Sequence, residues 1–184
     1  PVQLVVDKTP AKPGEPVLEV ENLTVPSQLH KNDAVKGVSF TARRGEIVCI
    51  AGIDGNGQSE LVYALTGLEK ASGGKITLLG KDITHASIRQ RSFAGMSHIP
   101  EDRHKHGLVL DYTLEQNLVL QRYYEPQFQH GGFIRFDEVR KYADKLIEEY
   151  DIRSGQGPVT IARSMSGGNQ QKAIVAREID RELP

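Results

Sequence analysis

The sequence predicts an α/β fold, and two observations lead to this prediction. An apolar run at residues 47–51 ends in the glycine-rich residues 52–59, and a helix-forming segment follows at once. Short strand-like segments surround this stretch, whereas the later part of the chain has apolar residues at helical spacing. A chain of 184 residues can bury about 70% of its unfolded surface, which is enough for one good core.

Four segments with alternating or consecutive apolar residues are expected to be strands: residues 17–23, 38–40, 46–51 and 75–79. The first two belong to an antiparallel edge sheet, and residues 46–51 are the expected central strand. Residues 59–65 are expected to form a helix that closes near Gly67, because glycine commonly ends helices. The last strand should end at the turn-forming residues 80–82.

The second half of the chain is expected to be helical. Thr113 is followed three positions later by Gln116, which matches a capping box and predicts a helix start. Residues 137–150 predict an amphipathic helix with one apolar stripe. The stripe consists of Val139, Tyr142, Ala143, Leu146, Ile147 and Tyr150. A helical insert therefore spans about residues 112–172 within the α/β core.

Composition limits the class of function. The formal net charge is −1, which argues against a protein whose main partner is nucleic acid. The single cysteine, Cys49, allows no disulfide within the chain, which fits a reducing compartment. Because Cys49 lies in an apolar run, we expect it to be a small buried residue of a strand. No apolar run approaches the roughly 18 residues that span a bilayer.

The glycine-rich stretch matches the phosphate-binding pattern G-x-x-x-x-G-K-[ST], with glutamine in place of lysine. In such a loop, backbone N–H groups cradle the phosphates and the lysine ammonium reaches the terminal ones. Gln58 brings no charge and Asp54 adds a carboxylate, so we expect weak nucleotide binding and little hydrolysis. The alternative is a glycine turn that binds no nucleotide. The candidate nucleotide-binding residues are Gly52, Ile53, Asp54, Gly55, Asn56, Gly57, Gln58, Ser59 and Glu60.

A second anion site is predicted where two glycines precede an amide-rich helix start. Free N–H groups at a helix N-terminus attract anions, and glycines let a phosphate approach the backbone closely. Ser166 is expected to cap this helix while offering its hydroxyl. An ordinary loop is the alternative. The candidate residues are Ser164, Met165, Ser166, Gly167, Gly168, Asn169, Gln170 and Gln171.

These two motifs, in this order, resemble those of the nucleotide-binding domain of ABC transporters. The spelling Ser-Gly-Gly-Asn-Gln-Gln-Lys at residues 166–172 is similar to the ATP-binding subunits of bacterial sugar and nucleoside importers, which carry two such domains in tandem. Three stretches of this chain resemble the second domain of that tandem. They are the lysine-less loop at residues 51–58, Pro-Glu-Asp-Arg at 100–103 and Gly-Leu-Val-Leu at 107–110. The resemblance runs from about Val17 to the end of the chain.

The resemblance implies a RecA-like phosphate-loop core with an antiparallel edge sheet and a helical subdomain that carries the ABC signature. It implies, in order, an inter-domain linker, an ATPase core, the helical subdomain and a helix that returns to the core: residues 1–16, 17–111, 112–172 and 173–184. In this family, the magnesium-binding aspartate and the catalytic glutamate come after these segments. The chain is therefore expected to be a truncated piece that does not hydrolyse ATP by itself.

The resemblance also implies an asymmetric pair of ATP sites. In this family two domains pair head to tail, and each ATP lies between the phosphate loop of one and the signature of the other. The intact signature is expected to complete the partner domain's site, whereas the loop with Gln58 forms a degenerate site. Glu101 stands where most members have a glutamine that touches the metal. The implied cofactors are ATP and Mg²⁺, with Ser59 as a weak magnesium ligand.

The function implied is a transport-coupled ATPase at the cytoplasmic face of the bacterial inner membrane. The implied partners are membrane permease subunits, the preceding nucleotide-binding domain of the same polypeptide and, indirectly, an extracytoplasmic solute-binding protein. The alternative is a soluble ABC-type ATPase that acts on the ribosome or DNA. The end of the signature, residues 100–103 and the lack of a basic excess favour the importer.

Three minor features leave alternatives open. No aromatic residue lies near residues 25–26, where family members stack the adenine, so Tyr112 and His30 are the candidates for that contact. The spacing of residues 104–106 could suggest a metal site, but a solvated loop is favoured. Four aromatic residues of the insert either pack in a core or face a membrane subunit: Tyr123, Tyr124, Phe128 and Phe133.

Overall fold

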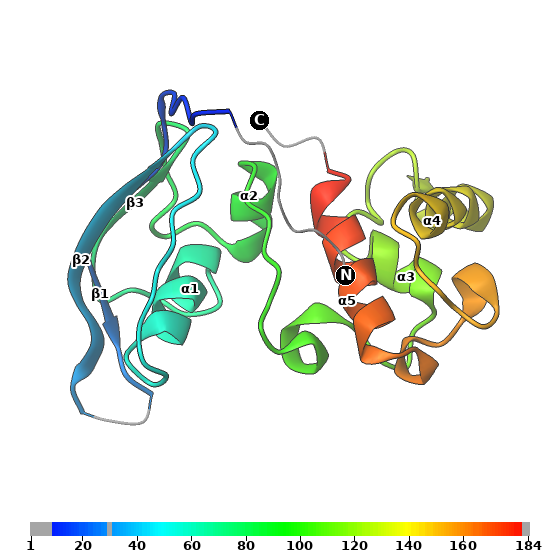
Figure 1. Ribbon diagram of the computed structural model, residues 1–184. Coiled ribbons are helices and arrows are strands. Elements are labelled where there is room, and N and C mark those ends of the chain that lie inside the picture. The colour runs from blue at the N-terminus through cyan, green and yellow to red at the C-terminus, as the bar shows by residue number, and fades with distance from the viewer. Residues whose placement is uncertain (1–8, 29–30, 182–184) are drawn as a thin grey trace. The chain divides into compact units, whose positions relative to one another are not determined.

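The computed structural model describes residues 9–28 and 31–181. These residues form two compact units, unit 1 up to Met96 and unit 2 from Ser97. Unit 1 contains a sheet with helices α1 (Gln58–Thr66) and α2 (Ile88–Phe93), and unit 2 is mainly helical (Figure 1). His30, a candidate for adenine stacking, lies outside the described residues.

Unit 1 is built on a four-stranded antiparallel sheet with the strand order β2-β1-β3-β4. The strands are β1 (Pro16–Pro26), β2 (Asp33–Arg43), β3 (Gly73–Leu78) and β4 (Lys81–Asp82). In the middle strand, Val20 pairs with Phe40 on one side and with Ile76 on the other. The strands predicted at residues 17–23, 38–40 and 75–79 are therefore confirmed.

The core of unit 1 lies between this sheet and α1, which runs beside it in Figure 1. Leu61 and Ala64 of α1 are buried against apolar residues of the strands. The helix begins after Gly57 and ends at Gly67, and both glycines have a left-handed backbone. The predicted helix at residues 59–65 and its glycine end are confirmed. The buried residues are Val20, Leu23, Val25, Val35, Leu61, Ala64, Ile76, Leu78 and Ile83.

The central strand predicted at residues 46–51 is wrong, because these residues form no strand in the described structure. Ile47 is 96% exposed, and Cys49, predicted to be buried, is exposed as well. A strand is stabilised by backbone hydrogen bonds to its neighbours, and none of the described strands pairs with this segment. An apolar run predicts a buried strand only where neighbouring strands are available to cover it.

The described part of unit 2 contains three α-helices: α3 (Leu114–Val119), α4 (Phe136–Glu149) and α5 (Gly167–Ile179). Its smaller elements are a π-helix at Arg103–Gly107, two 3-10 helices at Gly157–Val159 and Ala162–Ser164, and a hairpin of β5 (Gln129–His130) and β6 (Phe133–Ile134). Thr113 accepts a hydrogen bond from the Gln116 backbone, and its own backbone N–H donates to the Gln116 side chain. This arrangement confirms the capping box that starts α3.

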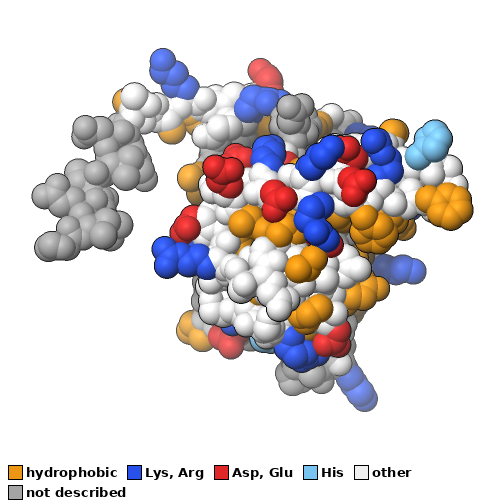
Figure 2. Space-filling model, turned by 90° about the vertical axis from the view of Figure 1, so that its right-hand side faces the viewer, with side chains coloured by type: hydrophobic (Ala, Val, Ile, Leu, Met, Phe, Trp, Pro, Cys, Tyr) orange, Lys and Arg blue, Asp and Glu red, His pale blue; other side chains and the backbone are white. Residues whose placement is uncertain are grey.

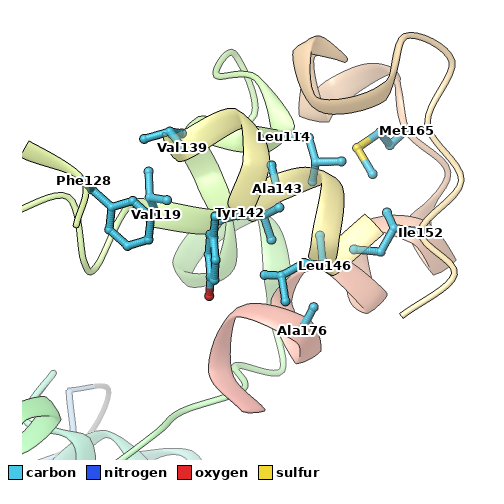
Figure 3. Close-up of a cluster of buried hydrophobic side chains, with 12 residues drawn as sticks. Leu114, Val119, Phe128, Val139, Tyr142, Ala143, Leu146, Ile152, Met165 and Ala176 are labelled. Atoms are coloured by element: carbon cyan, nitrogen blue, oxygen red, sulfur yellow. The ribbon is translucent and has the colours of Figure 1, made fainter. Parts of the chain in front are cut away.

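Helix α4 places its apolar stripe in the core of unit 2, as the sequence predicts (Figure 3). The rings of Tyr142 and Phe128 are tilted against each other with centroids 5.1 Å apart. Burial raises the pKa of the Tyr142 hydroxyl, so the hydroxyl stays protonated and donates to Asp180 over 2.9 Å. The other buried residues of this core include Leu114, Leu118, Val139, Ala143, Leu146, Ile152, Met165, Ala173 and Ala176.

The aromatic residues of the insert divide between the core and the surface. Phe128 is fully buried in the core of unit 2, whereas Phe133 is 81% exposed on the β5–β6 hairpin. Tyr123 is also exposed, and its ring meets that of Tyr124 edge to face. Figure 2 shows one face of the molecule, on which hydrophobic side chains are exposed among charged ones. Within the described ranges, no helix combines the length and apolar character that crossing a membrane requires.

Arg91 on α2 is a buried cation that ties together several segments of unit 1. Its side chain is 3% exposed and donates to four backbone carbonyls. Two of them, those of Ala64 and Leu65, belong to the end of α1, where a positive charge also interacts favourably with the helix dipole. The other two belong to Thr84 and Ala86, in the segment that leads from β4 to α2.

We expect Arg91→Met to lower the free energy of unfolding by about 3 kcal/mol or more, because it leaves four carbonyls with fewer donors in a site that excludes water. The measurement is urea unfolding followed by circular dichroism. Lys70→Met, at an exposed position of the same unit, is the matched control and should leave the midpoint unchanged. Equal midpoints for the two variants would contradict this role of Arg91.

Candidate functional site

The glycine-rich stretch of unit 1 forms a loop that leads directly into α1. Gly55 and Gly57 have φ angles of 83° and 93°, in the left-handed region that favours glycine. A Cβ atom at Gly57 would lie 2.5 Å from the carbonyl oxygen of Ala34 on β2, so a side chain does not fit there. The requirement for glycine at position 57 thus has a steric cause in the contact between the loop and the sheet.

The side chain of Gln58 folds back across this loop. Its Oε1 accepts a hydrogen bond of 3.1 Å from the backbone N–H of Asn56, and its Nε2 donates over 3.0 Å to the carbonyl of Ile53. A Cβ atom at Gly52 would lie 2.2 Å from the same Nε2. The carboxamide therefore contacts both ends of the loop, and it uses a backbone N–H of the kind that a phosphate would need.

An open cavity of about 720 Å³ lies beside the loop in unit 1. Residues of β2 and of the first turn of α1 line it together with the loop itself. The charged residues in the lining are Asp33, Lys36 and Glu60. Ser59 is exposed in the first turn of α1, and Asp54 is exposed in the loop. The predicted nucleotide-binding residues 52–60 are thus gathered around the start of α1.

The signature-like residues of unit 2 surround the N-terminus of α5. Ser166 is the N-cap residue, with φ −64° and ψ 151°, but its hydroxyl makes no hydrogen bond to the helix backbone. Instead, the hydroxyl accepts a hydrogen bond of 2.9 Å from the side-chain amide of Asn169. The prediction that Ser166 caps the helix is therefore correct in position and wrong in bonding. No side chain of the described residues caps the first-turn N–H groups of α5.

Burial separates the residues of this motif into two groups. Met165 and Gln170 are buried, and Gln170 donates to the carbonyl of Ala162 over 2.9 Å. Ser166 and Gly168 are exposed, as is Ser164. The buried members fix the helix start within unit 2, and the exposed members are accessible to a ligand.

The π-helix at Arg103–Gly107 packs directly on α5. His104 shares a hydrogen bond of 3.0 Å with Gln170, and a Cβ atom at Gly107 would lie 2.6 Å from Ile174. The Asp102 carboxylate accepts the backbone N–H groups of Lys105 and His104, which lower its pKa and stabilise the start of the π-helix. The prediction of a solvated loop at residues 104–106 is correct in that His104 and Lys105 are exposed, but it is wrong in conformation, because these residues form a π-helix against α5.

A buried ion pair near the other end of α5 holds this packing together. Arg177 and Glu178 are each 2% exposed and are 3.0 Å apart. Arg177 also donates to the carbonyl of Gly107, and Glu178 accepts from the side chain of Gln121. Burial lowers the pKa of nearby His98, whose backbone N–H faces Glu178. The network joins α5 to the segment that carries the π-helix.

The remaining predicted residues take simple positions. Glu101 is exposed directly before the π-helix, next to buried Pro100. Tyr112 is 46% exposed in unit 2. The described residues contain no group of three or more metal-ligating side chains. Sequence reasoning missed Arg103, which lies against Gly167, because its proximity to the signature is set by the tertiary packing of the π-helix on α5.

A profile of the ABC transporter family matches residues 35–183. The nucleoside import ATP-binding protein NupA of Lactococcus lactis is 47% identical over 180 residues, which cover 98% of this chain and 35% of that protein. The guanosine import ATP-binding protein NupO of Bacillus subtilis has the same identity and coverage. The ribose import ATP-binding protein RbsA of Caldanaerobacter subterraneus is 35% identical over 167 residues, covering 91% of this chain and 32% of that protein. The chain thus spans about a third of the length of these curated relatives.

Solved structures agree on the fold. The dimeric ATP-binding cassette MJ0796 with ADP and phosphate has a TM-score of 0.69 at 20% identity, over 88% of this chain and 68% of that one. A nucleotide-free cassette from an ABC transporter has a TM-score of 0.64 at 21% identity, over 89% of this chain and 64% of that one. At these identities the likeness shows the fold alone, a phosphate-loop core with an antiparallel sheet and helices. With the family profile covering most of its length, the chain belongs to the ABC transporter family and has the fold of its ATP-binding cassette.

Proposed function

We propose that this chain is part of the ATP-binding subunit of a bacterial ABC importer, and that it is the second nucleotide-binding domain of a tandem. The importer takes up a simple sugar or a nucleoside, and the subunit acts at the cytoplasmic face of the inner membrane. The names of the relatives support import over an action on the ribosome or DNA. Residues 1–16, 17–111, 112–172 and 173–184 are the linker, core, helical subdomain and return helix.

The observation that carries the proposal is the contrast between the two helix starts. At α1, the Gln58 carboxamide bonds the loop internally and brings no positive charge. At α5, as at α1, no described side chain caps the first turn, but here none occupies the preceding loop in the way Gln58 does, and Ser166 and Gly168 are exposed. A helix N-terminus with free N–H groups binds phosphate, whereas a loop that lacks its lysine binds it weakly. The first site is therefore degenerate, and the second supplies donors to a partner domain.

ATP and Mg²⁺ fit the residues of unit 1 only in part. The glycine conformations and the cavity beside the loop suit a nucleotide, and exposed Ser59 would hold the metal. The contact between Gln58 and Asn56 competes with a phosphate for the same backbone N–H. When bound, Mg²⁺ would neutralise phosphate charge, whereas the exposed carboxylate of Asp54 adds negative charge to the loop.

The signature acts in trans in this proposal. The exposed Ser166 hydroxyl and the first-turn N–H groups of α5 donate to the terminal phosphate that the preceding domain's loop holds. The buried residues Met165 and Gln170 keep this start of the helix in place. The partners are the preceding nucleotide-binding domain, the membrane permease subunits and, indirectly, an extracytoplasmic solute-binding protein.

The first prediction from this proposal concerns the loop. In the full-length tandem protein with its other site blocked, Gln58→Lys should tighten ATP binding about 10-fold or more, because a charge-assisted hydrogen bond replaces a neutral one. Hydrolysis at this site should stay low, because the carboxylate of Asp54 remains in the loop. Gln58→Met is the control that releases the loop contacts without adding charge. A nucleotide titration in which Lys and Met give equal affinities would refute the role of the missing charge.

The second prediction concerns the signature. In the full-length protein, Gly167→Asp and Ser166→Arg should each reduce ATP turnover and transport at least about 100-fold, because they put bulk or negative charge where the phosphate binds. The corresponding change in the other domain's signature should be milder, since that signature faces the degenerate loop. Gly155→Asp, at an exposed glycine with open space around it, is the matched control. Equal sensitivity of the two signatures would rule out the asymmetric arrangement.

A further inference from the structure

The guanidinium of Arg103 lies directly against the first turn of α5. A Cβ atom built on Gly167 would lie 2.9 Å from Nη2 of Arg103 and 3.4 Å from its Cζ. Side chains on a helix tilt toward the helix N-terminus, so this position is on the side of the open N–H groups. The charged group of Arg103 therefore stands beside the exposed start of the signature helix.

Arg103 differs from most of the other arginines of unit 2 in its partners. Arg122, Arg140, Arg163 and Arg177 each form an ion pair with a carboxylate. Arg103 forms none with the residues that the structure describes, and its buried Nε atom has no hydrogen-bond partner among them. A helix N-terminus carries partial positive charge, so a guanidinium beside it raises the free energy of the pair unless an anion is bound.

The position of Arg103 is fixed by its neighbours on both sides. Asp102 bonds the backbone immediately after Arg103 and orders the π-helix. His104 bonds Gln170, and Gly107 packs closely on Ile174. Because Gly167, Gln170 and Ile174 lie on one side of α5, the π-helix is held along that side with Arg103 at its open end.

We propose that Arg103 is a phosphate-binding residue of the signature site, and that it donates charge-assisted hydrogen bonds to the terminal phosphate of the ATP held by the partner domain. The proposal rests on the trans role of the signature given above. A guanidinium offers several N–H donors in one plane, which suits phosphate oxygens, and helix N–H groups beside it bind the same oxygens. Arg103 then brings positive charge to the partner's site, while the chain's own loop lacks it at Gln58.

The test uses the full-length tandem protein and equilibrium titration with ADP and with the non-hydrolysable β,γ-imido analogue of ATP. Arg103→Met should weaken the affinity for the analogue about 10- to 100-fold, which corresponds to the loss of a hydrogen bond to a charged group. The affinity for ADP should stay within about 2-fold of the original value. Arg103→Lys should retain most of the affinity, because it keeps the charge. Lys105→Met is the control on the same π-helix, at an exposed position, and should change neither titration.

Gly167→Asp, titrated in parallel, separates this inference from the proposed function. If it weakens the analogue and Arg103→Met does not, the role of Arg103 is refuted and the trans signature stands. Equal losses of affinity for ADP and for the analogue in Arg103→Met would also refute the role of Arg103, because a purely structural role affects the binding of both ligands. If Gly167→Asp has no effect, the trans signature itself is wrong. The Arg103→Lys variant keeps the test decisive if the methionine variant does not fold. If the Arg103→Lys protein binds the analogue as weakly as the Gly167→Asp protein does, a role of the positive charge is contradicted.

Discussion

The packing of one segment of unit 2 on helix α5 is the constraint on which the signature site depends. The buried pair Arg177 and Glu178 joins the last turns of α5 to the carbonyl of Gly107 and to Gln121. At the other end of the helix, His104 bonds Gln170. Breaking a buried ion pair leaves an uncompensated charge, so these contacts hold the segment in one register along the helix. That register decides which side chain stands beside the first turn.

The two glycine-rich helix starts show how similar sequences give different chemistry. Both begin a helix after a glycine or serine and both leave exposed residues at the start. In unit 1, the amide of Gln58 satisfies the loop from within, through Asn56 and Ile53. In unit 2, the amide of Asn169 bonds the Ser166 hydroxyl and leaves the helix N–H groups uncapped. The first-turn N–H groups have no side-chain cap at either helix start, so the two starts differ in the loop N–H of Asn56, which Gln58 occupies.

Local patterns in the sequence were enough to predict most elements and to locate both motifs. The strands around Val20, the capping box at Thr113 and the stripe of α4 depend on neighbours close in sequence, and they are confirmed. The absence of a strand at residues 46–51 could not be predicted from the apolar run, because strand pairing is decided by distant segments. The closeness of Arg103 to Gly167 has the same origin. It requires a π-helix that sequence periodicity does not signal and a close approach that Gly107 permits.

The positions of the charges make physical sense if each half of a tandem serves the other. A loop that has lost its lysine gains little from a cation at its own signature, because in a head-to-tail pair that signature faces the other domain's loop. In such a pair, the guanidinium beside Gly167 would act on the partner's nucleotide. The same guanidinium destabilises this chain, because it lies beside a positive helix end and forms no ion pair with a carboxylate of the described residues. Local rules of stability are most often broken at functional sites, and this is the place in unit 2 where the broken rule and the exposed donors coincide.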